Sequence, residues 1–598
     1  MKPLACTLLD RWPARSVAAE SVLRLAMVVL AAGLLASQWG VRAEAAALRI
    51  SVYATADDVL RHLAPTDQRD ATLAKLRPLG VSRVFLEGRR GDEYVPPRVL
   101  AEVRDWLAGQ GIASAGGIAT VPGNTFGTRQ NEGLGWLNWE DPRTRRDVAG
   151  FFSENADVFD EVIVDDFFCT GDTSPASDAA RAGRPWSQYR RDLLVSLIEP
   201  MIVQPARARR PDIRLIIKFP QWYDRFHLFG YDPERMAPPF DRVWVGTEAR
   251  NPLTRRMGYV QPTEGYMNFR WLHSVCGEKT VGAWFDHIEC TAENFVDQAF
   301  QSVLAGASEL TLFRLGDIVG DHPGDALLAR RLPDLFDLAQ KVKGQTRRGI
   351  AFYKPPNSDA DDNLYLADYL GMIGLPILPT ADWPANAAAV FLGAQAAADP
   401  EVVGKLRGVL DRGGTVVVTP AFLRRVGERV QLLAGVAVGP EPQAGEVATL
   451  GIGAAVHSLA HPLDVDLALE GRSARVRISG RAAGGTCPVL TERRESRGRF
   501  IVLNARTFSE ADFRAANEWL LSPKPLGWSQ LPAAVANEVR TRLTAPLRLR
   551  LAAPGGVGVY RFTAGTAMHN FRDQTVEVRA GRERLAIPPH DVRWVPAR

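Results

Sequence analysis

Between Leu48 and Gln345 the sequence alternates short apolar runs with longer amphipathic segments, and this alternation constrains the fold more than any other feature. Such a pattern is typical of successive strand–helix units around a parallel sheet. The apolar runs predict eight strands: Leu48–Tyr53, Arg83–Glu87, Ile112–Gly116, Glu161–Asp165, Arg214–Phe219, Arg242–Gly246, Thr280–Phe285 and Glu309–Phe313. Eight such units in roughly 300 residues predict a (β/α)8 TIM barrel.

The segments between these runs carry apolar residues three or four positions apart, as in Leu73, Leu76 and Leu79, which favours helices. Asp141-Pro142 adds a helix cap followed by a proline at the first helical position. The predicted helices are Asp58–Leu79, Pro97–Gly109, Asp141–Val158, Ser187–Ala208, Thr291–Leu304 and Asp325–Val342.

The pattern changes after the barrel, which we expect to span residues 46–346. Residues 347–525 predict a doubly wound α/β domain, starting with Ile350–Tyr353 and interrupted by a β insertion at 437–500. Its other strands are Pro376–Leu378, Ala388–Leu392, Thr415–Val418 and Arg499–Leu503, and its helices are Tyr365–Gly371, Pro400–Arg412 and a capped Ser509–Leu521. Short alternating runs in residues 546–598 predict a small antiparallel β-sandwich.

The first 45 residues are typical of a secretory signal peptide. Arg11, Arg15 and Arg24 precede an apolar run at 25–36, and the small-residue site Ala43-Glu44-Ala45 follows it. We therefore expect an exported protein, periplasmic or extracellular, with an uncleaved N-terminal anchor as the alternative. No later stretch is apolar enough to cross a membrane, so we expect no stable span after signal cleavage.

Charge and ligand patterns argue against several classes of partner. A net charge of +4 over 598 residues is close to balanced, which argues against nucleic acid as a partner. The sequence has no C-x-x-C or His/Cys cluster, so we expect neither a metal nor a cofactor.

The strongest candidate for catalysis is the run from Phe159 to Phe168, an apolar strand that ends in Asp165 and Asp166. Strand ends on the carboxyl side of a TIM barrel carry its chemistry, and clustered acids perturb each other's pKa. The alternative is that either aspartate caps the next helix or pairs with a buried arginine. Glu248, at the end of the sixth strand, is the expected partner acid, and Asp286 after the seventh strand is the second choice.

The other strand ends and their loops supply candidate substrate-binding residues. They are Tyr53, Glu87, Lys218, Trp284 and Arg314 at strand ends, and Trp136, Trp139, Trp222 and Tyr223 in the loops. Acids surrounded by aromatic rings suit a carbohydrate, although each tryptophan could instead be loop core. We expect Lys218 to pair with Asp165, and the alternative is that it binds a substrate hydroxyl or carboxylate.

The order of barrel, α/β domain and β-sandwich resembles the glycoside hydrolase family 42 β-galactosidases. In that family the middle domain is glutamine-amidotransferase-like and serves trimerisation, so the resemblance implies a homo-oligomer formed through residues 349–521. The amidotransferase nucleophile would be a cysteine after Ala388–Leu392, where this chain has Gly393-Ala394. A structural or binding role is therefore expected for this domain.

The fourth strand departs from family 42, which carries an Asn-Glu pair there. It resembles instead the glycosyl-hydrolase-like family 10, in which an Asp-Gly-Ile/Val stretch leads to Asp-Asp-Tyr/Phe. Glu161 stands here in place of the glycine. This resemblance implies that Asp165 is the catalytic carboxylate, and some members are linked to bacterial cell-wall glycans. Barrels of the α-galactosidase type also use strands four and six, which implies Glu248 as the general acid.

Together these observations predict an exported glycoside hydrolase that cleaves O-glycosidic bonds of an envelope or extracellular polysaccharide or oligosaccharide. Two carboxylates would carry the reaction. The alternative is a non-catalytic glycan-binding or envelope-assembly protein on the same scaffold.

Overall fold

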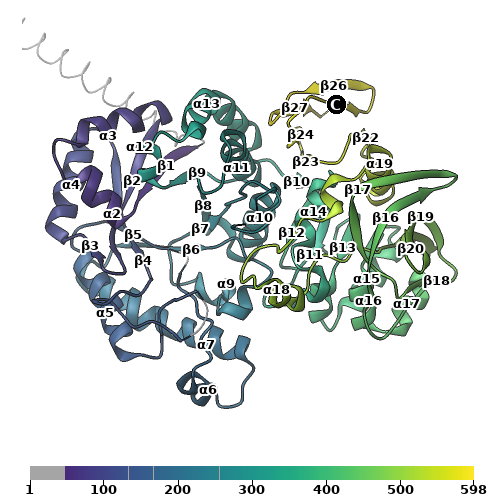
Figure 1. Ribbon diagram of the computed structural model, residues 1–598, viewed down its shortest axis with the longest axis horizontal. Helices are drawn as coiled ribbons and strands as arrows, with labels where there is room; N and C mark the ends of the chain where they lie inside the picture. The colour runs from purple at the N-terminus through teal and green to yellow at the C-terminus, as the bar shows by residue number, and fades with distance from the viewer. Residues whose placement is uncertain (1–47, 132–133, 166, 255, 598) are drawn as a thin grey trace, which may run out of the picture. The chain divides into compact units, whose positions relative to one another are not determined.

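Parallel strands close into an eight-stranded barrel in the N-terminal half of the chain (Figure 1). The strands are β1 (Arg49–Ala54), β2 (Val81–Arg90), β4 (Ala113–Ala119), β5 (Glu161–Val164), β6 (Arg214–Phe219), β7 (Arg242–Gly246), β8 (Thr280–Asp286) and β9 (Glu309–Phe313). Strand β1 pairs with both β2 and β9, which closes the ring, while the short β3 (Glu93–Tyr94) extends β2 as a hairpin. The predicted TIM barrel is confirmed.

The computed structural model describes residues 48–131, 134–165, 167–254 and 256–597. The predicted signal peptide and Asp166 therefore lie outside the described residues. Within these ranges, no helix is long and apolar enough to cross a membrane.

Helices surround the barrel strands (Figure 1). They include α3 (Arg69–Leu76), α4 (Pro97–Gly109), α5 (Pro142–Asn155), α7 (Trp186–Ile198), α8 (Gln204–Arg209), α11 (Ala292–Ala305) and α13 (Pro323–Val342). Two segments predicted as single helices are broken. Asp58–Leu79 divides into α2 (Ala56–Asp58), a π turn and α3, and a π turn at Glu199–Val203 separates α7 from α8. Pro65 and Pro200 lie at these breaks and lack the N–H that a continuous helix needs.

Helix α10 (Glu264–Cys276) was absent from the sequence prediction. Every residue from Glu264 to Phe269 is buried, as are Trp271 and Leu272. A helix buried on nearly all sides has no polar face, so it lacks the periodicity by which an amphipathic helix is recognised.

The interior of the barrel is a layer of buried side chains, most of them large. It contains Tyr53, Phe85, Ala115, Ile163, Ile216, Trp244 and Trp284. Gly282 makes room for the Trp244 indole, since a Cβ there would stand 2.0 Å from it. At the end where the strands begin, Arg83 donates to Glu309 at 2.9 Å and pairs with Glu161. Glu161 is thus a buried counter-ion, at the opposite end of β5 from Asp165.

A nine-stranded mixed sheet forms the middle part of the chain. Its parallel strands are, in sheet order, β12 (Ile377–Thr380), β11 (Ile350–Tyr353), β13 (Ala389–Leu392), β14 (Thr415–Val418) and β21 (Gly498–Leu503). The sheet continues with the antiparallel strands β20 (Gly485–Glu495), β19 (Arg475–Ala482), β16 (Ala444–Ile452) and β17 (Ala455–Asp466). Helices α14 (Leu366–Met372), α15 (Val402–Asp411), α16 (Pro420–Val426) and α17 (Glu428–Ala434) accompany it. The expected helix Ser509–Leu521 is shorter: α18 (Glu510–Ala516) begins at a Ser509 capping box and ends at left-handed Asn517.

Two small antiparallel sheets end the chain. One contains β10 (Arg347–Arg348), β23 (Val557–Phe562), β24 (Gly565–Asn570) and β27 (Val592–Pro596), and the other contains β22 (Leu551–Ala552), β25 (Val576–Ala580) and β26 (Glu583–Ile587). They share one apolar core, to which Val559, Met568 and Val578 belong. Helix α19 (Ala533–Leu543), which the sequence analysis did not assign, precedes them.

Candidate active site

Asp165 and Glu248 lie on either side of one lysine at the carboxyl ends of the barrel strands. Lys218, on β6, has its Nζ 3.6 Å from Asp165 Oδ1 and donates to Glu248 Oε1 at 3.1 Å. All three side chains are at least 96% buried. The expected pairing of Lys218 with Asp165 is present, and Glu248 shares the same ammonium. A further charge, Arg90, lies 3.2 Å from Asp165 Oδ2.

Glu248 has one carboxylate oxygen that no described residue satisfies. Its Oε2 is buried and accepts no hydrogen bond within the described ranges. Burial raises the pKa of this carboxyl; the Lys218 ammonium lowers it, and the charge of Asp286 raises it again. The side chain folds back over its own strand, because Gly246 has no Cβ to block it. A buried oxygen without a partner is free to act on a ligand.

Asp286, the second choice for the general acid, is held by its neighbours. Its Oδ2 pairs with Arg250, and its Oδ1 accepts from the Ile288 backbone N–H at 3.1 Å. Arg250 is itself buried, and its Nε and Nη1 have no acceptor among the described residues. These two buried N–H groups retain unused hydrogen-bonding capacity.

Glu87 lies in the barrel but is fully engaged by protein groups. It accepts hydrogen bonds from the Tyr53 hydroxyl at 2.8 Å, from the Ala56 backbone and from Arg90. Since Arg90 also reaches Asp165, Glu87 orients the arginine that contacts the candidate catalytic acid. Glu87 is therefore placed to position Arg90. This corrects its expected role as a residue that contacts the substrate.

The six aromatic candidates are buried among other side chains and present no open faces to a sugar. The most exposed of them, Trp222, retains 4% of its surface. Trp284 stands 4.6 Å from the Tyr53 ring and 4.5 Å from the Lys218 ammonium, so it forms the floor beneath the acids. Trp136 stacks on Trp222 at 6.1 Å in the loops. This corrects the expected aromatic platforms in favour of the loop-core alternative, since packing within the protein covers the rings.

Three candidates have partners other than the two acids. Trp139 is loop core and donates to the Cys169 carbonyl at 2.7 Å. The Tyr223 hydroxyl donates to Asp368 of the middle domain at 2.8 Å, so this residue belongs to an internal contact between domains. Arg314 is 39% exposed and lies 3.9 Å from Asp58 and 3.8 Å from Asp317.

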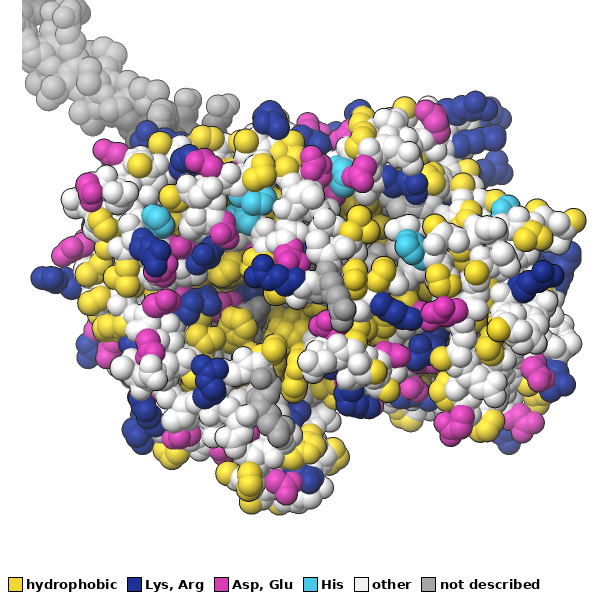
Figure 2. Space-filling model, in the orientation of Figure 1, with side chains coloured by type: hydrophobic (Ala, Val, Ile, Leu, Met, Phe, Trp, Pro, Cys, Tyr) yellow, Lys and Arg dark blue, Asp and Glu magenta, His cyan; other side chains and the backbone are white. Residues whose placement is uncertain are grey.

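The molecular surface is hollowed over the barrel (Figure 2). Hydrophobic side chains form most of the floor of this hollow, and acidic and basic side chains lie at its edge. Arg90 and Arg250, which contact the strand-end acids, were not selected from the sequence. Arg90 follows Glu87 by three positions and Arg250 follows Glu248 by two. An arginine at this spacing after a strand-end acid is the sequence signal by which they could have been predicted.

Comparisons with known proteins identify the family of the barrel. Residues 38–337 match the family model described as "Probable glycosyl hydrolase, catalytic domain", which is half of the chain. Residues 345–439 match the second domain of the uncharacterised protein SSO3021. A protein of that name from Saccharolobus solfataricus is 24% identical over 363 residues, which are 55% of this chain and 59% of that protein. The chain thus spans less than two thirds of this relative.

Solved structures share the fold along nearly the whole chain. A β-galactosidase from Rahnella sp. R3 has a TM-score of 0.62 at 12% identity, covering 93% of this chain and 99% of that one. Gan42B, a GH42 β-galactosidase from G. stearothermophilus, has a TM-score of 0.61 at 12% identity, covering 93% and 99%. An α-L-fucosidase from Paenibacillus thiaminolyticus has a TM-score of 0.59 at 10% identity, covering 92% and 98%. The barrel, the mixed α/β domain and the antiparallel sheets therefore follow the GH42-like order, and the chain belongs to the family of probable glycosyl hydrolase catalytic domains.

Proposed function

We propose that this protein is an exported glycoside hydrolase that cleaves an envelope or extracellular polysaccharide or oligosaccharide. Asp165 and Glu248 would be its two carboxylates. The observation that carries the proposal is their common contact with Lys218 at the mouth of a barrel whose family is that of glycosyl hydrolases. Paired carboxylates across a glycosidic bond are the usual catalysts of this reaction.

The environments of the two acids support different roles. Burial raises the pKa of Glu248, and its unpartnered Oε2 can carry a proton toward the leaving oxygen. Asp165 lies against Arg90 and Lys218, so two cations flank the candidate nucleophile. We assign the general acid to Glu248 in preference to Asp286, because Arg250 and a backbone N–H already engage both oxygens of Asp286.

The spacing of the acids is compatible with a retaining reaction, which we take as the assignment to test. The two distances to Lys218 Nζ add up to an upper limit of about 6.7 Å between Asp165 Oδ1 and Glu248 Oε1. Retaining enzymes hold their carboxyl groups about 5 to 5.5 Å apart, and inverting enzymes about 6.5 to 9.5 Å apart. Proton NMR of the first product formed would reveal its anomer, and an inverted anomer would contradict this assignment.

The middle domain resembles an amidotransferase without its nucleophile, and we propose a structural role for it. Gly393-Ala394-Gln395 follows β13, and Gln395 donates to Asp224 of the barrel at 3.4 Å. Lys354, after the neighbouring β11, lies 3.8 Å from the same carboxylate. The strand order reverses between β11 and β13, which is where such sheets bind ligands. A barrel side chain thus occupies that crevice.

An activity screen tests the proposed function directly. Purified protein would be incubated with envelope and plant polysaccharides and with aryl glycosides, beside the Asp165→Asn variant. Release of reducing sugar by the wild type but not by the variant is the expected result. Binding of a polysaccharide by both proteins, with hydrolysis by neither, would favour the non-catalytic glycan-binding alternative.

A further inference from the structure

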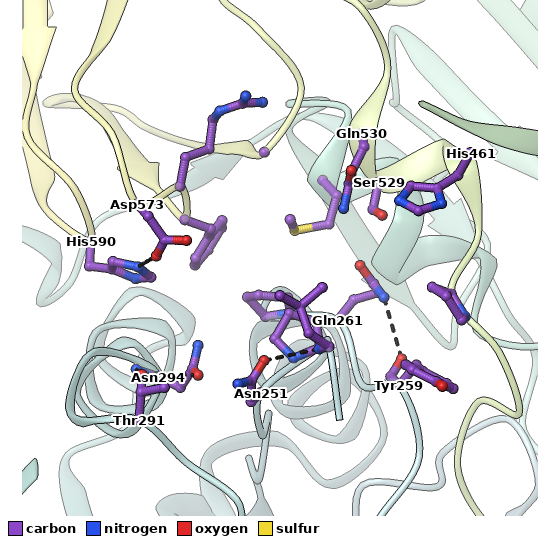
Figure 3. Close-up of a pocket in the computed structure, with 18 of the residues that line it drawn as sticks. Asn251, Tyr259, Gln261, Thr291, Asn294, His461, Ser529, Gln530, Asp573 and His590 are labelled. Carbon is purple, nitrogen blue, oxygen red and sulfur yellow. Dashed lines mark hydrogen bonds and ion pairs between the residues drawn. The ribbon is translucent and has the colours of Figure 1, made fainter. Parts of the chain in front are cut away.

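A second cavity, of about 770 Å³, lies beside the barrel mouth (Figure 3). The loop after β7 and the start of α11 line it on the barrel side, and residues of the middle and C-terminal parts of the chain line the rest. In Figure 3, Asp573 and His590 lie on one side of the space and Ser529, Gln530 and His461 on the other, with Asn251 and Gln261 between them. Its volume is within the range of small-molecule sites, about 300 to 1,000 Å³.

The cavity is separate from the candidate catalytic acids but close to them. Neither Asp165 nor Glu248 lines it. Asn251, which does, follows Arg250, the partner of Asp286. Asn251 is three positions after Glu248, so their α-carbons are at most about 11 Å apart at the standard spacing. A ligand long enough to cover this span could occupy the barrel mouth and the cavity together.

Uncharged hydrogen-bonding groups dominate the wall. Five side-chain amides line the cavity, from Asn251, Gln261, Asn294, Gln530 and Gln574. An amide both donates and accepts, as does a sugar hydroxyl. Gln530 and Gln574 are exposed, and neither side chain hydrogen-bonds to another group in the described ranges. They therefore need not break an internal bond to engage a ligand.

The charges at the wall balance one another: Arg572 and the protonated His590 are cations, and Asp573 and the neighbouring Asp297 are carboxylates. His590 contacts Asp297 at 2.6 Å and Asp573 at 3.0 Å. Although burial lowers it, these two carboxylates raise the pKa of His590 to about 9, so the imidazolium is neutralised within the protein. Arg572 donates to the Gly555 carbonyl at 3.1 Å. Tyr259 and Phe571 add apolar ring surface. The cavity thus suits a neutral polyhydroxylated ligand better than an anion.

We propose that this cavity is a distal binding site for the chain of a neutral glycan whose scissile linkage lies in the barrel mouth. The inference rests on the proposed hydrolase function and narrows its substrate class. The preferred substrate is then an oligosaccharide or polysaccharide that spans both sites, and a disaccharide is too short to use the second one.

The test uses a double variant that carries both Gln530→Ala and Gln574→Ala. Its control is Gln110→Ala, which changes an exposed glutamine at the end of α4. One arm measures kcat/KM on an aryl monosaccharide and on the di- to hexasaccharides of a neutral glycan that the wild type cleaves. We expect the double variant to lose about tenfold on the hexasaccharide and nothing on the aryl glycoside, because two hydrogen bonds are removed only from the longer ligand. Gln110→Ala should match the wild type on both.

A binding arm separates failure of this inference from failure of the proposed function. Calorimetry would use the Asp165→Asn protein, with and without the double substitution, titrated with cellohexaose, mannohexaose and β-1,4-galactohexaose. Hydrolysis that does not depend on chain length or on the two glutamines would contradict the distal-site proposal and leave the hydrolase proposal standing. If the wild type cleaves nothing, the hydrolase proposal fails. The cavity assignment fails as well if the Asp165→Asn protein binds no hexasaccharide, or binds it equally well with and without the double substitution.

Discussion

Glu248 Oε2 lies 2.3 Å from the point that a Cβ on Gly246 would occupy. The acid therefore adopts its position over the end of β7 only because residue 246 is a glycine. The backbone at Pro220 and Gln221 also lies about 3.1 Å from that point, so the strand end cannot shift to relieve a clash. A glycine two residues before the candidate acid thus positions it by the absence of a side chain.

Gly246→Ala should displace the Glu248 carboxyl and reduce kcat while leaving the fold intact. A displacement of about 1 Å in a catalytic group can cost roughly a hundredfold in rate. The measurement is kcat on the best substrate of the screen, with circular dichroism to check folding. Gly150→Ala is the matched control, because a Cβ at that position in α5 meets nothing within 4 Å. Wild-type kcat in Gly246→Ala would remove Glu248 from the mechanism.

The second prediction concerns the candidate nucleophile. Asp165→Asn keeps the size of the side chain but removes its charge, so hydrolysis should fall by three or more orders of magnitude. Asp160→Asn is its control: Asp160 lies just before β5, exposed and paired with Arg210, and its loss should leave turnover unchanged. If circular dichroism shows that Asp165→Asn is folded and its turnover equals that of the wild type, Asp165 has no catalytic role.

The third prediction uses Lys218, whose charge lowers the pKa of Glu248. In Lys218→Met this lowering is lost, so the pKa of the general acid should rise and the basic limb of the pH–rate profile should move to higher pH. Loss of an opposite charge at this distance typically shifts a pKa by about one unit or more. The profile of residual activity measures the shift. A basic limb that stays in place would show that Glu248 does not supply the proton.

The barrel could be predicted from the sequence because its strands are local signals. Arg214–Phe219, Arg242–Gly246 and Glu309–Phe313 were predicted with the observed bounds, since each is rich in apolar residues and almost entirely buried. Asp165 and Glu248 could be expected at one end of the barrel for a related reason: in a parallel barrel, the residues after the strands lie at the same end.

What the sequence could not reveal depends on long-range contacts. Tyr223 is an aromatic residue in a functional loop, and only the fold shows that its hydroxyl meets Asp368, 145 positions later. Trp139 likewise turns inward to a carbonyl of another loop. The distal cavity combines segments more than 300 residues apart, such as Asn251 and Gln574, so no local pattern marks it.

The fourth prediction concerns assembly. If residues 349–521 serve as in family 42, the protein should form a homo-oligomer through its middle domain. Light scattering at micromolar concentration measures the molar mass directly. A single species at the mass of one chain, 65.5 kDa or less after processing, would contradict this prediction and leave the catalytic proposal untouched.

The last prediction uses the buried carboxyl of Asp368, which accepts from Tyr223 at the contact between the barrel and the middle domain. Burial raises its pKa well above the ordinary value; the hydrogen bond from Tyr223 opposes this, and the charge of Asp224 adds to it. The folded protein therefore binds a proton that the unfolded chain releases above about pH 4. The free energy of unfolding consequently falls as pH rises from there toward the raised pKa.

Asp368→Asn keeps the oxygen that accepts from Tyr223 and is neutral at every pH, so it should remove this loss of stability. Calorimetry should find similar Tm values for the variant and the wild type near pH 4, and a Tm higher by at least about 2 °C for the variant at pH 8. Asp411→Asn, an exposed acid at the end of α15, should show no such growth with pH. A difference between Asp368→Asn and the wild type that stays constant from pH 4 to pH 8 would mean that Asp368 is ionised in the folded protein.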